Sequence, residues 1–178
     1  MNENNDKKPK QLCLMSLRTE NVGPMFDDRT KQYEFRTWFP WNFKGRIFVY
    51  ESGPNSKHKV VGFFDTRQVF TLEYGKPWPK GFQPYVDKTC PQSLMELNDV
   101  SESLQPGKRI CVIPVFAPRR MICEKTLAEF NRAYGVKFAQ GYDNPRDRDL
   151  TRPPMSWRLI EANYDGEDDA YPPMKRRQ

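Results

Sequence analysis

Residues 45–64, GRIFVYESGPNSKHKVVGFF, carry the strongest secondary-structure signal in the chain. Residues 46–50 are rich in β-branched and aromatic side chains, which predicts a strand. Residues 52–56 contain glycine, proline and asparagine, which is typical of a turn. The apolar pattern resumes over residues 59–72, where we expect a second β segment with Gly62 as a candidate bulge. This stretch therefore predicts a fold built mainly from short strands.

The rest of the chain adds further strands and a few helices. Continuous or alternating apolar runs predict strands over residues 12–17, 33–38, 109–116 and 156–160. Apolar residues at helical spacing predict helices over residues 91–104 and 124–134, and a short helical turn over 25–31. The sum indicates an α+β fold or a small barrel with short flanking helices.

Length and composition indicate one folded domain. The chain has 178 residues with 13% aromatic side chains, which argues against disorder because each ring can bury a large apolar area. The formal charge is +6. Residues 161–178 hold five acids and three bases, which leaves a charge of +8 on residues 1–160. This balance permits a polyanionic partner without identifying one.

Several classes of protein are excluded by what the sequence lacks. No apolar run approaches the ~18–20 residues that span a bilayer, and the polar residues 1–10 lack the apolar stretch of a secretory signal. The four cysteines show no CxxC pair and His58 is the single histidine, so we expect no metal site and no cofactor. Reduced thiols without membrane contact predict a cytoplasmic protein.

The charged residues of the segment KQYEFR, residues 31–36, stand out as a candidate site. In a strand Glu34 and Arg36 share one face, and Lys31 lies just before it and can turn to the same side. Such a set could hydrogen-bond a base edge and neutralise a phosphate. The alternative is a solvated strand face with an exposed ion pair worth ~0–1 kcal/mol.

Three patches in order resemble ASCH domains, a branch of the PUA-like superfamily. Lys31, Glu34 and Arg36 fit the signature Gly-x-Lys-x-x-Glu/Thr-x-Arg, although Arg29 stands at the glycine position. Residues 45–64 resemble the strand, turn and Val-Val-Gly strand that follow in the family. The segment PPMSWR, residues 153–158, is similar to the closing Pro-Pro-x-Ser-(aromatic)-Arg motif.

The resemblance implies a small PUA-like β-barrel with short flanking helices. It spans about residues 12–161, so we expect a domain over residues 11–161 with an insertion within 77–120. A disordered leader, residues 1–10, and a disordered tail, residues 162–178, are expected on either side.

The resemblance also implies that the protein binds RNA or a modified nucleotide, with DNA as an alternative polymer. Some small members of the family are amidohydrolases that act on acetylcytidine with the motif lysine, the motif threonine and a separate glutamate. Lys31 stands at the lysine position and Glu34 at the threonine position. An acylcytidine-type amidohydrolase or a ribonuclease, with Lys31 and Glu34 as catalytic residues, is therefore the second hypothesis. A non-enzymatic protein-interaction module is the third.

Other residues join the candidate binding site on their own chemistry or through the closing motif. Trp38, Phe39, Trp41 and Phe43 cannot all face one core, and Trp41 is expected to be exposed for stacking on a base. Basic clusters offer phosphate contacts. The full predicted set is Lys31, Glu34, Arg36, Trp41, Arg46, Arg119, Arg120, Ser156 and Arg158.

Overall fold

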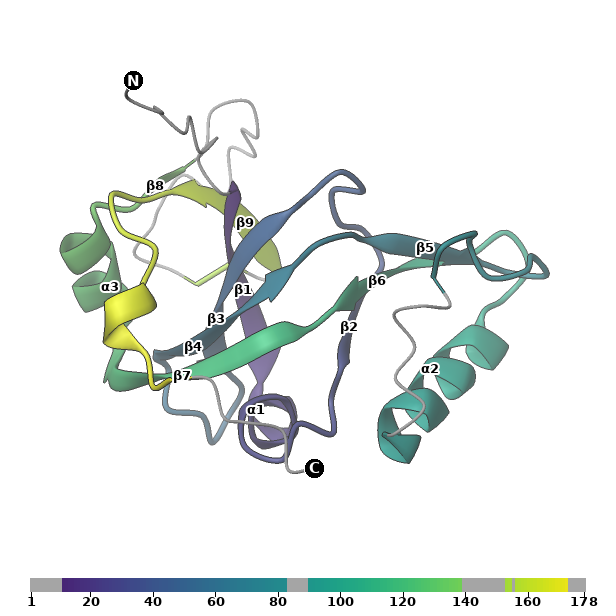
Figure 1. The fold of residues 1–178 in the computed structure, drawn as a ribbon, viewed down its shortest axis with the longest axis horizontal. Coiled ribbons are helices and arrows are strands. Elements are labelled where there is room, and N and C mark those ends of the chain that lie inside the picture. The colour runs from purple at the N-terminus through teal and green to yellow at the C-terminus, as the bar shows by residue number, and fades with distance from the viewer. Residues whose placement is uncertain (1–10, 83–89, 139–152, 155, 173–178) are drawn as a thin grey trace, which may run out of the picture.

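The computed structural model describes residues 11–82, 90–138, 153–154 and 156–172 (Figure 1). The strands are β1 (Gln11–Arg18), β2 (Tyr33–Arg36), β3 (Gly45–Ser52), β4 (Val60–Thr66), β5 (Phe70–Glu73), β6 (Arg109–Pro114), β7 (Phe116–Lys125), β8 (Lys137–Phe138) and β9 (Trp157–Glu161). The helices are α1 (Thr19–Phe26), α2 (Pro91–Ser103), α3 (Leu127–Tyr134) and the short 3-10 helix η3 (Glu167–Asp169). The predicted α+β class is confirmed.

The strands form two sheets. The large sheet has the order β7-β4-β3-β1-β9-β8, and the small sheet has the order β2-β6-β5. Strands β1 and β3 are parallel, and every other pair in both sheets is antiparallel. Among the described residues neither sheet closes on itself, so the barrel expected from the family resemblance is not confirmed.

The chain crosses between the two sheets four times, and two of these crossings are short. Strand β4 of the large sheet leads into β5 of the small sheet, and β6 leads back into β7 through Val115 alone. Because β4 pairs with β7 and β5 pairs with β6, the two crossings run side by side (Figure 1). These two short crossings therefore fix the position of one sheet relative to the other.

Strand β1 lies at the centre of the large sheet and is buried on both faces. Cys13, Met15 and Leu17 enter one core cluster, while Leu12 and Leu14 enter another. This alternation explains why the sequence of β1 reads as a continuous apolar run, since no position faces solvent along its middle.

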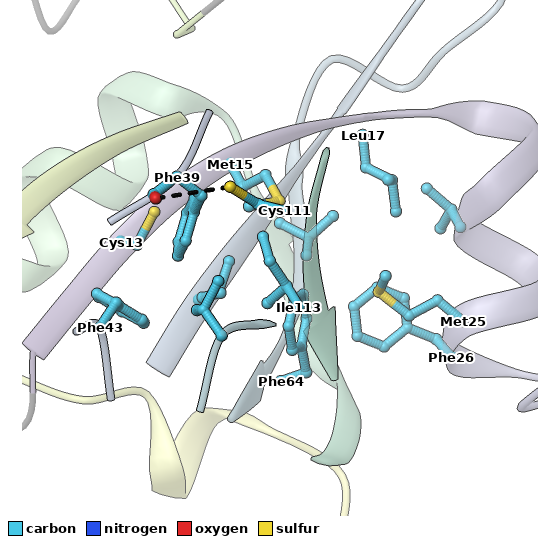
Figure 2. Close-up of a cluster of buried hydrophobic side chains, with 14 of the residues drawn as sticks. Cys13, Met15, Leu17, Met25, Phe26, Phe39, Phe43, Phe64, Cys111 and Ile113 are labelled. Atoms are coloured by element: carbon cyan, nitrogen blue, oxygen red, sulfur yellow. Dashed lines mark hydrogen bonds between the residues drawn. The ribbon is translucent and has the colours of Figure 1, made fainter. Parts of the chain in front are cut away.

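The first core cluster fills the space between the large sheet, the small sheet and α1 (Figure 2). Met25 and Phe26 enter it from α1. The thiol of Cys111 donates to the carbonyl oxygen of Phe39 at 3.8 Å. Burial raises the pKa of the Cys13 thiol, which behaves here as a small apolar side chain.

The other two clusters attach the remaining helices. Helix α3 packs Phe130 and Tyr134 against Phe48 on the second face of the large sheet. Helix α2 packs Leu97 against the small sheet, with Phe82 between them. A capping box at Thr126 and a left-handed Gly135 fix the two ends of α3.

Most predicted elements are confirmed, with differences that have local causes. The helix near the start spans Thr19–Phe26 and not residues 25–31, because Gly23 and Pro24 lie inside the helix instead of ending it. The β segment 59–72 divides into β4 and β5. In the pairing of β3 with β4 the register shifts between Val49 and Tyr50, where β4 has one extra residue beside Gly62, in agreement with the predicted bulge.

The segment after β9 differs from the expected disordered tail as far as residue 172. Tyr164 and Ala170 pack against the second core cluster, and η3 lies between them. The expected leader, residues 1–10, lies outside the described residues. Over the described ranges, no helix is long and apolar enough to cross a membrane.

Candidate functional site

The loop before β2 places Lys31 beside the small sheet. Arg29 has a φ of 55°, in the left-handed region that glycine adopts most easily. The backbone turns sharply at this position, which is the kind of turn that glycine usually makes. The amide of Lys31 then donates to the carbonyl oxygen of Pro24 at 3.1 Å, which fixes the loop against α1.

Lys31, Glu34 and Arg36 form one buried charge network. The Nζ of Lys31 lies 3.5 Å from Oε2 of Glu34, and Arg36 pairs with Oε1 of the same carboxylate. Lys31 is 6% exposed and Glu34 is 3% exposed. The predicted shared face is therefore confirmed, whereas the alternative of an exposed ion pair on a solvated strand is wrong because the small sheet is covered here.

The cover comes from α2, whose Glu96 accepts a hydrogen bond from Nζ of Lys31 at 2.7 Å. Ser93, one turn earlier, accepts from the amide of Gln32 at 3.0 Å and donates to the carbonyl of Thr30. Neither residue was predicted from the sequence. Their spacing with Leu97 on the predicted helix was the available signal, because all three share one helical face.

The environment of Glu34 combines burial with two cations. Burial raises the pKa of the Glu34 carboxyl, and the charges of Arg36 and Lys31 oppose that effect. Glu96 adds a like charge that raises the pKa further. The arrangement holds two carboxylates and two cations within hydrogen-bonding reach, so it is suited to moving a proton or orienting a polar ligand.

Arg36 connects this network to the closing motif. Its Nη2 donates to the carbonyl oxygen of Ser16 at 2.7 Å. The amide of Ser16 donates to the carbonyl of Ser156 at 2.9 Å, and its hydroxyl donates to the carbonyl of Pro154. Two motif patches that are more than a hundred residues apart in the sequence thus meet at Ser16.

Two exposed tryptophans follow β2, and one of them, Trp38, contacts the closing motif through Trp157. Trp41 is 79% exposed and Trp38 is 53% exposed, whereas Phe39 and Phe43 are buried in the core. The indole of Trp157 packs on Trp38 with ring centroids 4.9 Å apart and donates to its carbonyl oxygen at 2.9 Å. The expected exposure of Trp41 is confirmed.

Arg46 and Arg119 do not join the Lys31 network. Arg46 is 2% exposed, lies 3.9 Å over the ring of Phe63, and pairs with Asp65 at 2.8 Å. Glu167 binds both arginines, at 2.8 Å from Nη2 of Arg46. Because the segment containing η3 occupies both guanidinium groups, their predicted role as nucleic-acid contacts is not supported by their positions.

Arg120 and Arg158 also lie apart from Lys31. Arg120 reaches across to α1, where its Nε donates to Asp27 at 2.9 Å. Arg158 is buried on β9 opposite Leu14. Within the described ranges, no group of three or more His, Cys, Asp or Glu side chains could hold a metal ion.

Comparisons with known proteins found similar solved structures but no match by sequence. No protein-family model and no curated protein matches the sequence. The solved structure of ASCH from Zymomonas mobilis is 15% identical, with a TM-score of 0.49, and the match covers 85% of this chain and 89% of that chain. Structures of two mutants of that protein match at the same TM-score, with 14% and 15% identity.

Proposed function

We propose that the protein is a PUA-like ASCH domain that binds RNA or a modified nucleotide beside Arg36. The observation that carries the proposal is the pair of exposed indoles, Trp38 and Trp41, in the segment that follows Arg36. Exposed rings beside a cation are the surface on which unpaired bases stack.

The accessible part of the network is Arg36, because Lys31 lies beneath α2. The Arg36 side chain is 18% exposed and the Ser156 residue is exposed. In this proposal a base stacks on the exposed indoles and its phosphate contacts the exposed part of the Arg36 side chain. Lys31 and Glu34 then support binding by holding Arg36 in place and not by touching the ligand.

The proposal predicts that Trp41→Ala weakens binding of single-stranded RNA by roughly tenfold or more, since stacking contributes ~1–3 kcal/mol per base. Fluorescence anisotropy with a labelled oligonucleotide measures the loss. Because the Trp41 side chain is almost fully exposed, the variant should unfold at the wild-type temperature.

Tyr74→Ala is the matched control, since Tyr74 is also exposed, at 51%, and lies at the end of β5. Equal affinities for wild type and Trp41→Ala would contradict the assignment of the surface. Absence of salt-dependent RNA or DNA binding by the wild-type protein would sink the function itself and favour the protein-interaction alternative.

A second candidate function, hydrolysis of acylated cytidine, is favoured by Glu96. In the resembling amidohydrolases a separate glutamate acts with the motif lysine, and Glu96 is the carboxylate that contacts Nζ of Lys31 here. Such a pair can accept a proton from an attacking water and return it to the leaving amine.

Incubation with acetylcytidine, read by chromatography, tests this candidate. The expected products are cytidine and acetate, and Glu96→Gln should abolish them while Glu102→Gln on the exposed side of α2 should not. Failure of the wild-type protein to release cytidine would exclude this activity and leave the binding proposal intact.

The proposed RNA partner fits a cytoplasmic location. All four cysteines, Cys13, Cys90, Cys111 and Cys123, are free thiols, as expected for a reducing compartment.

A further inference from the structure

A shallow groove of about 460 Å³ lies on β7, an edge strand of the large sheet. It is lined by side chains from three segments that are distant in the sequence. Lys57 and Lys59 come from the turn between β3 and β4, Arg120 and Glu124 come from β7, and Tyr171 follows η3. The fold, and not the sequence order, brings these residues together.

The groove carries three cations and one carboxylate. Lys57 binds Glu124 at 2.7 Å, and Nη1 of Arg120 lies 3.8 Å from the same carboxylate. Lys59 has no ion pair among the described residues and acts on Glu129 only at longer range. The charge of Lys59 is therefore not compensated by a direct partner among the described residues, and its ammonium group can bind an anion.

The ring of Tyr171 is presented from a fixed backbone. Its amide donates to the carbonyl of Arg120 at 2.9 Å, and its own carbonyl accepts from Nε of Arg119 at 2.7 Å. Yet the residue is 54% exposed, and its neighbour in the groove, Ile122, is 52% exposed. An exposed aromatic ring on a fixed backbone beside cations is suited to stacking on a flat ligand.

We propose that this groove binds a segment of single-stranded nucleic acid, with Tyr171 stacking on a base and Lys59 contacting a phosphate. The inference rests on the proposed RNA-binding function and extends it to a second surface. Cations interleaved with an exposed ring are the arrangement that binds single strands without sequence preference. An acidic peptide would use the cations alone and would leave the ring of Tyr171 without a stacking partner.

The test compares a single nucleotide with a labelled RNA oligonucleotide of about 12 nucleotides, a length within the range of single-strand binding sites. Lys59→Ala should weaken binding of the oligonucleotide and reduce the slope of log K against log salt by about 0.7. Tyr171→Ala should weaken it by roughly tenfold. Neither variant should change binding of the single nucleotide, which needs only the surface at Trp41.

Matched controls separate the groove from general effects of charge and aromatic content. Lys108→Ala removes an exposed lysine in the turn before β6, and Tyr74→Ala removes a ring of similar exposure. Thermal melts should show that all four variants fold, since Tyr171→Ala keeps both backbone hydrogen bonds.

The outcomes distinguish the groove from the proposed function. If Trp41→Ala weakens the oligonucleotide but Lys59→Ala and Tyr171→Ala behave like their controls, the groove proposal is overturned and the RNA-binding function stands. If the wild-type protein binds neither probe, both are overturned. Binding of a polyglutamate peptide that is lost in Lys59→Ala but kept in Tyr171→Ala would overturn the nucleic-acid assignment of the groove.

Discussion

At the scale of single residues, Glu34 has the most demanding environment in the candidate site. Its carboxylate is almost fully buried and is contacted by Lys31 and Arg36. Removal of one charge from a buried ion network leaves the other charges without compensation, and that loss is larger than the net contribution of the network itself. Glu34 therefore holds Arg36 in place, and its substitution should also destabilise the fold.

We expect Glu34→Ala to lower the free energy of unfolding by about 3–5 kcal/mol, because it leaves the buried cations of Lys31 and Arg36 without their shared acceptor. Urea denaturation followed by circular dichroism measures the change.

Glu73→Ala is the control, because Glu73 pairs with Lys76 at the surface and such pairs contribute ~0–1 kcal/mol. Similar unfolding midpoints for the two variants would show that Glu34 is not held as a buried charge.

The residue scale also shows what the sequence could predict about the site. The spacing of Lys31, Glu34 and Arg36 correctly predicted that they meet, because strand alternation places residues two apart on one face. It could not predict their burial. The covering residues, Ser93 and Glu96, lie more than fifty residues away on α2, and only the tertiary fold brings that helix to β2.

At the scale of elements, local patterns predicted the strands and the longer helices well. Errors occur where tertiary contacts override a local signal. Gly23 and Pro24 normally end helices, yet α1 passes through them because Val22, Met25 and Phe26 all pack into the core.

Strand β7 is the clearest element that the local pattern did not predict. Its sequence FAPRRMICEK contains proline and two arginines, which do not indicate a strand. It forms as an edge strand, where proline and charged residues are tolerated. The same edge position exposes the side chains that line the groove. The place of β7 at the edge of the sheet therefore explains why local patterns predicted neither the strand nor the groove.

At the scale of the whole molecule, the charges of the described C-terminal segment fold back onto the basic body. Asp165 and Glu167 bind Arg46, Glu167 also binds Arg119, and Asp169 contacts Lys125 and the hydroxyl of Tyr134. From the sequence alone, the basic charge is expected on a folded body that is separate from an acidic tail. In the structure part of that charge is neutralised within the fold.

This segment should make stability depend on acid pH. A hydrogen bond from Tyr134 and the charge of Lys125 lower the pKa of Asp169 in the folded protein. Its stabilisation is therefore complete above the unfolded pKa of about 4 and is lost as pH falls through the lower folded value. We expect the free energy of unfolding of the wild-type protein to decrease as the pH drops below about 4. Denaturant titration at a series of pH values measures this change.

Asp169→Asn should be less stable than wild type at pH 7 by up to about 1 kcal/mol, since the side chain is partly exposed. The difference should shrink in acid. Glu34 acts in the opposite direction, because its raised pKa makes protonation favourable in the folded state, and both proteins retain that effect. A difference that grows as pH falls would contradict the role of Asp169.

The pairing of β1 with β9 sets an order for folding. Leu12 lies opposite Ile160, so the centre of the large sheet joins two segments from nearly opposite ends of the domain. The parallel partner β3 can pair with β1 early, but the other side of β1 stays open until β9 has been synthesised. Long-range strand pairing is slow, and an unpaired apolar strand can associate with other chains. On the ribosome, the nascent chain must therefore keep β1 half-paired until almost the whole domain has emerged.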